Sequence, residues 1–162
     1  MVSACCEIVT TRDIARQILR HRSFSFQEFS QRYADPTAEL DEAFVLREAR
    51  LQDNKNRQNS IDIDDTLLQN DWYRAQQRVI YAAQREYEWA INQGIAKEQA
   101  RVVLPEGMTI SRMYMKGSLR SWIHYVELRS ANGTQKEHQE VALECARVIT
   151  EIFPLAETLV QK

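Results

Sequence analysis

Apolar residues recur along this chain with two different periods, which predict a mixture of strands and helices. Residues 2–10 are mostly small or β-branched and predict a first strand. Thr10 or Thr11 can cap a following helix that runs to about His21. Residues 23–33 open with alternating serine and phenylalanine, which is typical of an extended segment whose side chains point to opposite faces.

The middle of the chain changes from a polar stretch to a long amphipathic helix. Asp35-Pro36 ends the extended segment, and residues 41–65 are polar with one expected strand at Phe44–Leu51. From about Thr66 to Asn92, apolar residues at spacings of three, four and seven predict a helix that Gly94 can terminate. The apolar stripe of this helix comprises Trp72, Val79, Ala83, Tyr87, Ala90 and Ile91.

Four shorter elements complete the pattern. They are a helix at Ala96–Leu104, a strand at Thr109–Lys116, a helix with the buried stripe Leu119, Trp122, Ile123 and Val126, and a final helix at Val141–Phe153. Pro105 stops the first of them, and His138 is expected to be an ordinary exposed residue of the last helix. Together the elements predict one α+β domain over residues 1–162, rich in helices and with a small sheet.

Composition excludes several classes of protein. The chain has 162 residues, 44% of them apolar and 27% charged, which excludes disorder and leaves room for a real core. No apolar run approaches the ~18 residues that a membrane span needs. A net charge of −2 argues against general nucleic-acid binding. The 16 arginines far outnumber the 5 lysines, which suits an anionic small-molecule site but also ordinary surface composition.

The cysteines and histidines argue against disulfides and metal. Cys5, Cys6 and Cys145 are odd in number and have no C-x-x-C spacing, so a reducing, cytoplasmic setting is expected. The chain has only three histidines, and none of them forms a zinc-binding H-E-x-x-H pair. We therefore expect no protein-built metal site.

The densest polar cluster is Arg20-His21-Arg22, followed by Glu28, Ser30 and Arg32. Gln17 lies three residues before Arg20, so both side chains project from one face of the first helix. Arginines, hydroxyls and one carboxylate suit a nucleotide cradle in which the arginines bind phosphate. No glycine-rich phosphate loop is present, and the alternative is a solvated surface or an oligomer contact.

A second polar cluster lies on the helix after residue 118. Arg120 and His124 are four residues apart on the face opposite the apolar stripe, and Arg129 lies at or just past the helix end. Arg101 stands apart and could pair with Glu98, and a purely structural role for His124 stays open.

The order of these motifs resembles the flavin-dependent thymidylate synthases. Arg20-His21-Arg22, seven intervening residues and Ser30 match that family's R-H-R-x7-S signature. The matching flanks are Gln17-Ile18-Leu19, Gln31-Arg32-Tyr33, Glu98-Gln99-Ala100-Arg101 with Leu104-Pro105, Ser118-Leu119-Arg120-Ser121, and Glu127-Leu128-Arg129 leading to Glu137. The resemblance covers the chain from about Cys6 to Phe153.

The resemblance implies an activity and an assembly. Members of the family convert dUMP to dTMP with methylenetetrahydrofolate as carbon donor, FAD as hydride carrier and NADPH as the reductant of the flavin. The protein supplies binding, orientation and electrostatics. Members work as homotetramers whose sites draw on several chains, so the two clusters need not meet within one subunit.

The resemblance also implies roles for individual residues. The residues that would bind dUMP are Gln17, Arg20, Glu28, Ser30, Gln31, Arg32 and Arg129, with Arg101 reaching the nucleotide from a neighbouring subunit. Those that would contact FAD are Arg20, His21, Arg22, Glu28, Ser118, Arg120 and His124. Arg129 matches the family's activating arginine, which would favour ionisation of the uracil ring at N3 and push electron density toward C5.

The chain departs from the family pattern in two ways. Gln27, Gln31 and His124 replace frequent Asn, Gly and Asn residues, and each keeps hydrogen-bonding ability. Members also carry several dozen residues before the point where Met1 aligns, so the start is expected to be an internal methionine or that of a shortened form. Two alternative functions remain: a related UMP/dUMP C5-modifying enzyme, or a nucleotide-binding remnant without flavin activity.

Overall fold

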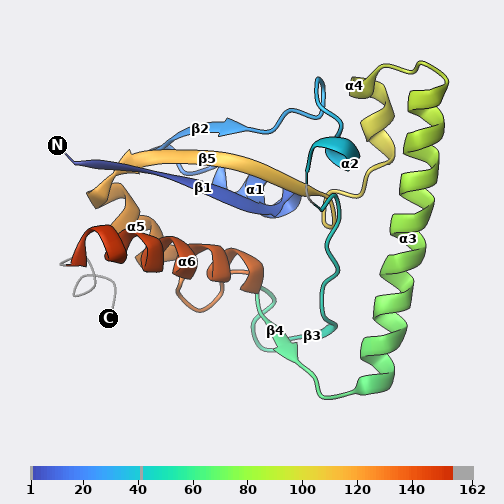
Figure 1. Ribbon diagram of the computed structural model, residues 1–162. Helices are drawn as coiled ribbons and strands as arrows, with labels where there is room; N and C mark the ends of the chain where they lie inside the picture. The colour runs from blue at the N-terminus through green and yellow to red at the C-terminus, as the bar shows by residue number, and fades with distance from the viewer. Residues whose placement is uncertain (1, 41, 155–162) are drawn as a thin grey trace.

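An antiparallel three-stranded sheet organises the fold of this computed structural model, which describes residues 2–40 and 42–154 (Figure 1). The strands are β1 (Ser3–Thr11), β2 (Ser25–Glu28), β3 (Arg50–Gln52), β4 (Ser60–Asp62) and β5 (Ile110–Ser118). The helices are α1 (Arg12–Ile18), α2 (Pro36–Glu39), α3 (Thr66–Asn92), α4 (Lys97–Ala100), α5 (Leu119–Arg129) and α6 (Lys136–Ile152), with a 3₁₀ turn at Arg101–Val103. β5 lies between β1 and β2, while β3 and β4 form a separate hairpin.

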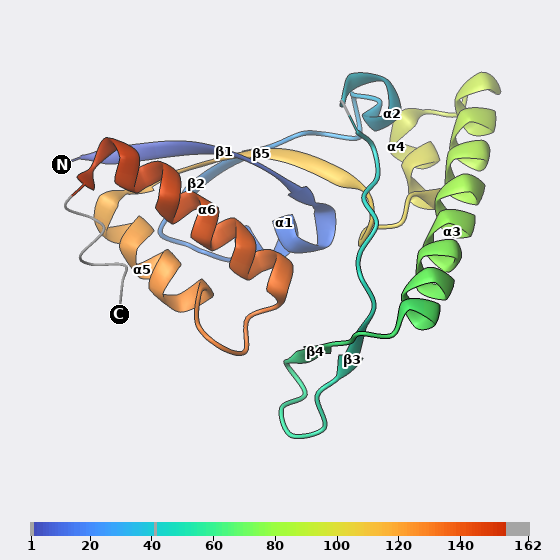
Figure 2. The ribbon, with the colours of Figure 1, turned by 60° about the horizontal axis from the view of Figure 1, so that its bottom comes forward.

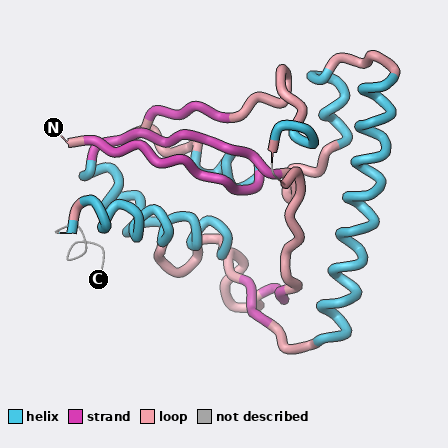
Figure 3. Tube along the Cα trace, in the orientation of Figure 1, coloured by secondary structure: helices cyan, strands magenta, loops and turns pink. Residues whose placement is uncertain are grey.

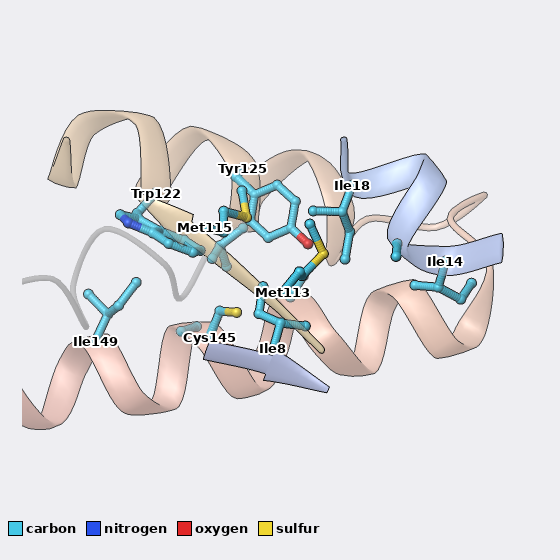
Figure 4. Close-up of a cluster of buried hydrophobic side chains, with 13 residues drawn as sticks. Ile8, Ile14, Ile18, Met113, Met115, Trp122, Tyr125, Cys145 and Ile149 are labelled. Atoms are coloured by element: carbon cyan, nitrogen blue, oxygen red, sulfur yellow. The ribbon is translucent and has the colours of Figure 1, made fainter. Parts of the chain in front are cut away.

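One face of the sheet carries the main core. Strand residues alternate between faces, so Ile8, Met113 and Met115 point toward α1, α5 and α6. Trp122 and Tyr125 from α5 fill the space between sheet and helices, and both are 1% exposed (Figure 4). This arrangement confirms the predicted α+β class and the small sheet.

The long helix α3 stands apart from the sheet in both ribbon views (Figures 1 and 2). Its predicted bounds are confirmed, with Asp65 Oδ1 accepting from the backbone N–H of Leu68 at 3.0 Å. Its C-terminal half packs on the residues around the 3₁₀ turn, but Trp72 and Val79 in its first half are 44% and 48% exposed. Among the described residues, no helix has the length and hydrophobicity that crossing a membrane requires.

The strand expected at Phe44–Leu51 is mostly wrong. Phe44 forms only an isolated bridge to Thr109, and regular pairing begins at Arg50. Figure 3 draws the path leading into β3 as loop. The intervening backbone is bound by two glutamine side chains of α3. Gln76 accepts from the N–H of Arg47 at 2.8 Å and donates to its carbonyl at 2.7 Å. Gln69 makes the same pair of bonds to Ala49, so side-chain amides replace a neighbouring strand.

Other predicted bounds also change. The first helix ends at Ile18 rather than at about His21, so Arg20 lies in the turn beyond it and not on a helix face shared with Gln17. The extended segment contains regular strand only at Ser25–Glu28, and the predicted helix at Ala96–Leu104 is α4 followed by the 3₁₀ turn. The last helix begins at Lys136, five residues before the predicted start. The prediction that His138 is exposed is wrong, because this earlier start places it on the buried side of α6, where it is 0% exposed.

Gly117, near the end of β5, lies close against the ring of Phe24. A Cβ atom there would lie 2.5 Å from Cδ1 of Phe24, whose ring packs on Trp122 at a centroid distance of 4.9 Å. We expect Gly117→Ala to lower the free energy of unfolding by about 1–3 kcal/mol, because Phe24 must leave its packed position. Thermal and denaturant unfolding measure the change.

Gly107→Ala is the matched control for this variant. Its added Cβ would come no nearer than 3.9 Å to another atom, the carboxylate oxygen of Asp13. Equal stability losses in the two variants would contradict the steric explanation.

Candidate functional site

The R-H-R segment and Arg129 meet although 108 residues separate them. Arg20, His21 and Arg22 follow the end of α1, and the N–H of His21 donates to the carbonyl of Ile18 at 3.0 Å. Arg129 is the last residue of α5, and its Nε donates to Nε2 of His21 at 2.9 Å. The structure thus brings the R-H-R part of the first predicted cluster together with Arg129 of the second within a single chain.

His21 is neutral in this arrangement. A guanidinium can only donate, so the Nε2 atom of His21 must be unprotonated to accept the bond from Arg129. Burial and, next, the positive charges of Arg129, His124 and Arg20 together lower the pKa of His21 to about 4. The surroundings of His21 are therefore strongly positive.

Four arginines of the predicted site have no carboxylate partner in the described part of the chain. Within residues 2–40 and 42–154, Arg20, Arg22, Arg120 and Arg129 form no ion pair with an acidic side chain. Other arginines of the chain do, such as Arg47, whose Nη2 lies 2.8 Å from the carboxylate of Asp13. Guanidinium groups without carboxylate partners suit the binding of phosphate or another anion.

The start of α5 holds three of the predicted flavin contacts. Ser118 caps the helix, with its Oγ accepting from the N–H of Ser121 at 3.2 Å. Arg120 and His124 lie one turn apart on the exposed side of α5, opposite the buried Trp122. Arg120 and His124 therefore lie on the face predicted for them, opposite the apolar stripe.

The remaining predicted residues form a second group. Glu28 accepts from Ser111 Oγ at 2.7 Å, and its Oε1 lies 3.6 Å from a guanidinium nitrogen of Arg12. Ser30 ends the extended segment, where its carbonyl accepts from the N–H of Tyr33 at 3.1 Å. Gln31 is 3% exposed, and its Nε2 has no hydrogen-bond partner in the described chain.

Arg32 and Arg101 complete this second group through one acidic residue. Arg32 pairs with the carboxylate of Glu98 at 3.3 Å, and Arg101 Nε donates to the backbone carbonyl of Glu98 at 3.3 Å. No hydrogen bond or ion pair between described residues connects this group with the group around His21. One chain therefore presents two partial sites.

Gln17 links the first group to residues that the sequence analysis missed. Its Nε2 donates to Gln135 Oε1 at 2.8 Å, and its Oε1 lies 3.3 Å from Nδ1 of His138. The hydroxyl of Tyr125 lies 3.1 Å from Nε2 of His138. A sequence signal existed, because His138 continues the spacing of four, three and four made by the buried residues 142, 145 and 149.

A separate groove of about 840 Å³ lies between β1, residues 45–48 and α6. None of the predicted site residues lines it. In the described part of the chain, no group of three or more His, Cys, Asp and Glu side chains is arranged to hold a metal ion.

Comparison with known proteins identifies the family. Residues 1–155 match the family model described as "Thymidylate synthase complementing protein". A flavin-dependent thymidylate synthase from Synechocystis is 51% identical over 154 residues. The chain belongs to the flavin-dependent thymidylate synthase family. This confirms the family predicted from the motif order and the class of function that its members carry.

Further relatives agree with this membership. A probable flavin-dependent thymidylate synthase of Paramecium bursaria Chlorella virus 1 is 48% identical, and one from Kosmotoga olearia is 32% identical. The matches cover 95%, 91% and 88% of this chain but 69%, 66% and 60% of the three relatives, in the order given. The chain therefore spans about two thirds of the length of these relatives.

A solved structure supports the fold assignment. The UMP/dUMP methylase PolB from Streptomyces cacaoi, bound to 5-Br UMP, superposes with a TM-score of 0.83 at 26% identity. The likeness covers 97% of this chain and 73% of that one. The flavin-dependent thymidylate synthase fold of this chain is thus shared with an enzyme described as acting on both uridylates.

We expect the free energy of unfolding to decrease as the pH is lowered from about 7 toward 4. An unfolded histidine binds a proton near pH ~6.5, whereas burial holds the pKa of folded His21 and His138 at about 4. The unfolded chain therefore binds more protons in this window, so acid favours unfolding. NMR titration of the imidazole resonances, with unfolding curves at several pH values, measures both quantities. Titration of either ring near the ordinary histidine value contradicts the assignment.

Proposed function

We propose that this chain converts dUMP to dTMP, using methylenetetrahydrofolate as carbon donor, FAD as hydride carrier and NADPH as the reductant of the flavin. The observation that carries the proposal is that Arg20 and Arg129, beside neutral His21, have no carboxylate partner among the described residues. Both dUMP and FAD carry phosphate, which such guanidinium groups suit. Family membership supplies the reaction class.

The proposed dUMP site draws on both groups of residues. Its members are Gln17, Arg20, Glu28, Ser30, Gln31, Arg32, Arg129 and, from a neighbouring subunit, Arg101. The buried Nε2 of Gln31 supports this role, because a buried donor without a protein partner is costly unless a ligand accepts its hydrogen. The ion pair of Arg32 with Glu98 is largely exposed, so phosphate can compete for that guanidinium.

Arg129 is proposed as the catalytic residue. Its Nε is occupied by His21, which leaves both terminal nitrogens available for the carbonyl edge of the uracil ring. A guanidinium held in this way stays protonated and stabilises negative charge that develops when N3 ionises. Ionisation at N3 makes C5 more electron-rich, and C5 is the atom that receives the carbon unit.

The residues present fit a flavin dinucleotide. We propose that His21, Arg22, Ser118, Arg120 and His124 hold FAD together with Arg20 and Glu28. The guanidinium groups of Arg20, Arg22 and Arg120 are exposed and free of carboxylates in the described chain, which suits a diphosphate. When bound, FAD supplies hydride transfer, while the protein binds and orients both ligands.

A homotetramer with shared sites is part of this proposal. The first half of α3 keeps its apolar stripe uncovered, with Trp72 and Val79 nearly half exposed. Exposed apolar surface of this kind marks protein contacts. The separation of the two groups of site residues within one chain also supports sites completed by a neighbouring subunit.

We propose a cytoplasmic location for the protein. The thiols of Cys5, Cys6 and Cys145 are all free. Free thiols persist in reducing compartments, which supports this location.

We expect Arg129→Ala to lower the turnover of dUMP by two to three decades while FAD binding is retained. Loss of an electrostatic contact made in the transition state costs roughly 3–4 kcal/mol. Formation of dTMP followed by chromatography measures turnover, and visible absorbance of the purified protein measures bound flavin. Arg147→Ala is the control, since Arg147 pairs with Glu144 and Glu151 on the exposed side of α6.

The same assay separates the competing functions. Turnover of dUMP in preference to UMP supports the proposal, whereas preference for UMP identifies a related C5-modifying enzyme. A folded protein that binds no added FAD and converts neither nucleotide is a remnant. Unchanged turnover in Arg129→Ala removes that residue from the mechanism.

We expect the double variant Trp72→Arg, Val79→Arg to form smaller assemblies than the wild type. Both positions lie on the uncovered part of the α3 stripe, where a buried charge would oppose contact with a neighbouring subunit. Sedimentation velocity measures the assembly, and circular dichroism verifies that the helices remain. A tetramer of unchanged stability in this variant argues against α3 as the contact.

A further inference from the structure

His138 lies at the centre of a series of hydrogen-bonded polar side chains, partly buried, that no predicted role explains. Its imidazole ring is completely buried between α5, α6 and α1. Both ring nitrogens have a partner, Gln17 Oε1 at 3.3 Å from Nδ1 and Tyr125 Oη at 3.1 Å from Nε2. A buried histidine with two specific partners is ordered, so its ring has one orientation.

The carboxylate of Glu137 fixes the donor and acceptor of every hydrogen bond in this series. Glu137 can only accept, so the amide nitrogen of Gln135 faces it at 2.9 Å and the amide oxygen of Gln135 faces Gln17. The nitrogen of Gln17 then donates to Gln135, and its oxygen must accept from Nδ1 of His138. Nε2 of His138 carries no proton and accepts from the hydroxyl of Tyr125.

The series of hydrogen bonds is anchored at Glu137 and leads, through Tyr125 at its other end, toward Arg129. Arg50 forms an ion pair with Glu137, which holds the carboxylate in place. At the other end, the ring of Tyr125 meets His21 edge to face with centroids 4.9 Å apart and planes at 86°. Because His21 accepts a hydrogen bond from Arg129, the orientation of the Tyr125 ring affects the position of the Arg129 guanidinium through His21.

We propose that His138 is a positioning residue for the reaction, which it serves in the Nδ1-protonated form. Through Nδ1 it holds the amide of Gln17 in the nucleotide site, and through Nε2 it holds Tyr125 against His21 and hence Arg129. This inference rests on the proposed function. Replacement of a residue that supports and orients site groups commonly lowers activity by about 10–100-fold.

Two substitutions separate the two arms of His138. In His138→Asn the side-chain amide can replace the Nδ1 donor to Gln17 but cannot reach Tyr125, so kcat should fall about tenfold with little change in the KM for dUMP. In His138→Gln the amide oxygen can replace Nε2 but the bond to Gln17 is lost, so the KM should rise several-fold with a smaller loss in kcat. A purely structural role predicts no such split.

Tyr125→Phe tests the same arm without changing the histidine. It removes only the hydroxyl that donates to His138, so its kcat should fall as in His138→Asn. The double variant His138→Asn, Tyr125→Phe should have a kcat no lower than either single variant, because both changes break the same hydrogen bond between residues 138 and 125. Ile149→Val is the control for weaker packing, since Ile149 is buried on the same helix away from these polar side chains.

The outcomes distinguish this inference from the proposed function. A folded wild type that converts no dUMP overturns the proposed function. An active wild type whose His138 variants match Ile149→Val in kcat and KM overturns the positioning role alone. If both His138 variants fail to fold, Tyr125→Phe decides: a kcat equal to the wild type overturns the role, and a tenfold loss supports it.

Discussion

The antiparallel pairing of β1 with β5 is the constraint on which the rest of the structure depends. The nine-residue ladder spans about 27 Å. α1 starts from one end of it and α5 from the other, and both pack on the same face. With 7 and 11 residues they are about 10 and 16 Å long, so their C-terminal ends come together near the middle of the ladder.

This meeting of helix ends accounts for the electrostatics of the site. The C-terminal end of a helix carries partial negative charge and stabilises cations. Arg20, His21 and Arg22 follow the end of α1, and Arg129 is the last residue of α5. The helix ends therefore compensate part of the positive charge without carboxylates, which would compete with phosphate for the same guanidinium groups.

Much of the fold and of the candidate site was predictable from the sequence, because the sequence patterns that indicate them are local or occur in a strict order. The periods of two and 3.6 residues located the long strands and helices, and the order of the arginine motifs identified the family. His138 was mispredicted because the polar residues 136–140 mask a helical spacing that begins before the apolar run. The hydrogen bonds of Gln69 and Gln76 with the backbone of Ala49 and Arg47 were also unpredictable, since no sequence pattern marks a glutamine whose side chain takes the place of a neighbouring strand. The exposure of Trp72 shows a further limit, because periodicity reports an apolar face but not what covers it.

Those two glutamines have a consequence for assembly. Gln69 and Gln76 are two helical turns apart. Gln69 makes a donor and an acceptor bond to the backbone of Ala49, and Gln76 makes the same two bonds to Arg47. A rotation or a one-residue slip of α3 would break all four bonds together, so intermediate positions are disfavoured. The rotation of α3 about its axis is therefore fixed before any partner binds. A neighbouring subunit would bind a helix that is already ordered, so association loses less conformational entropy.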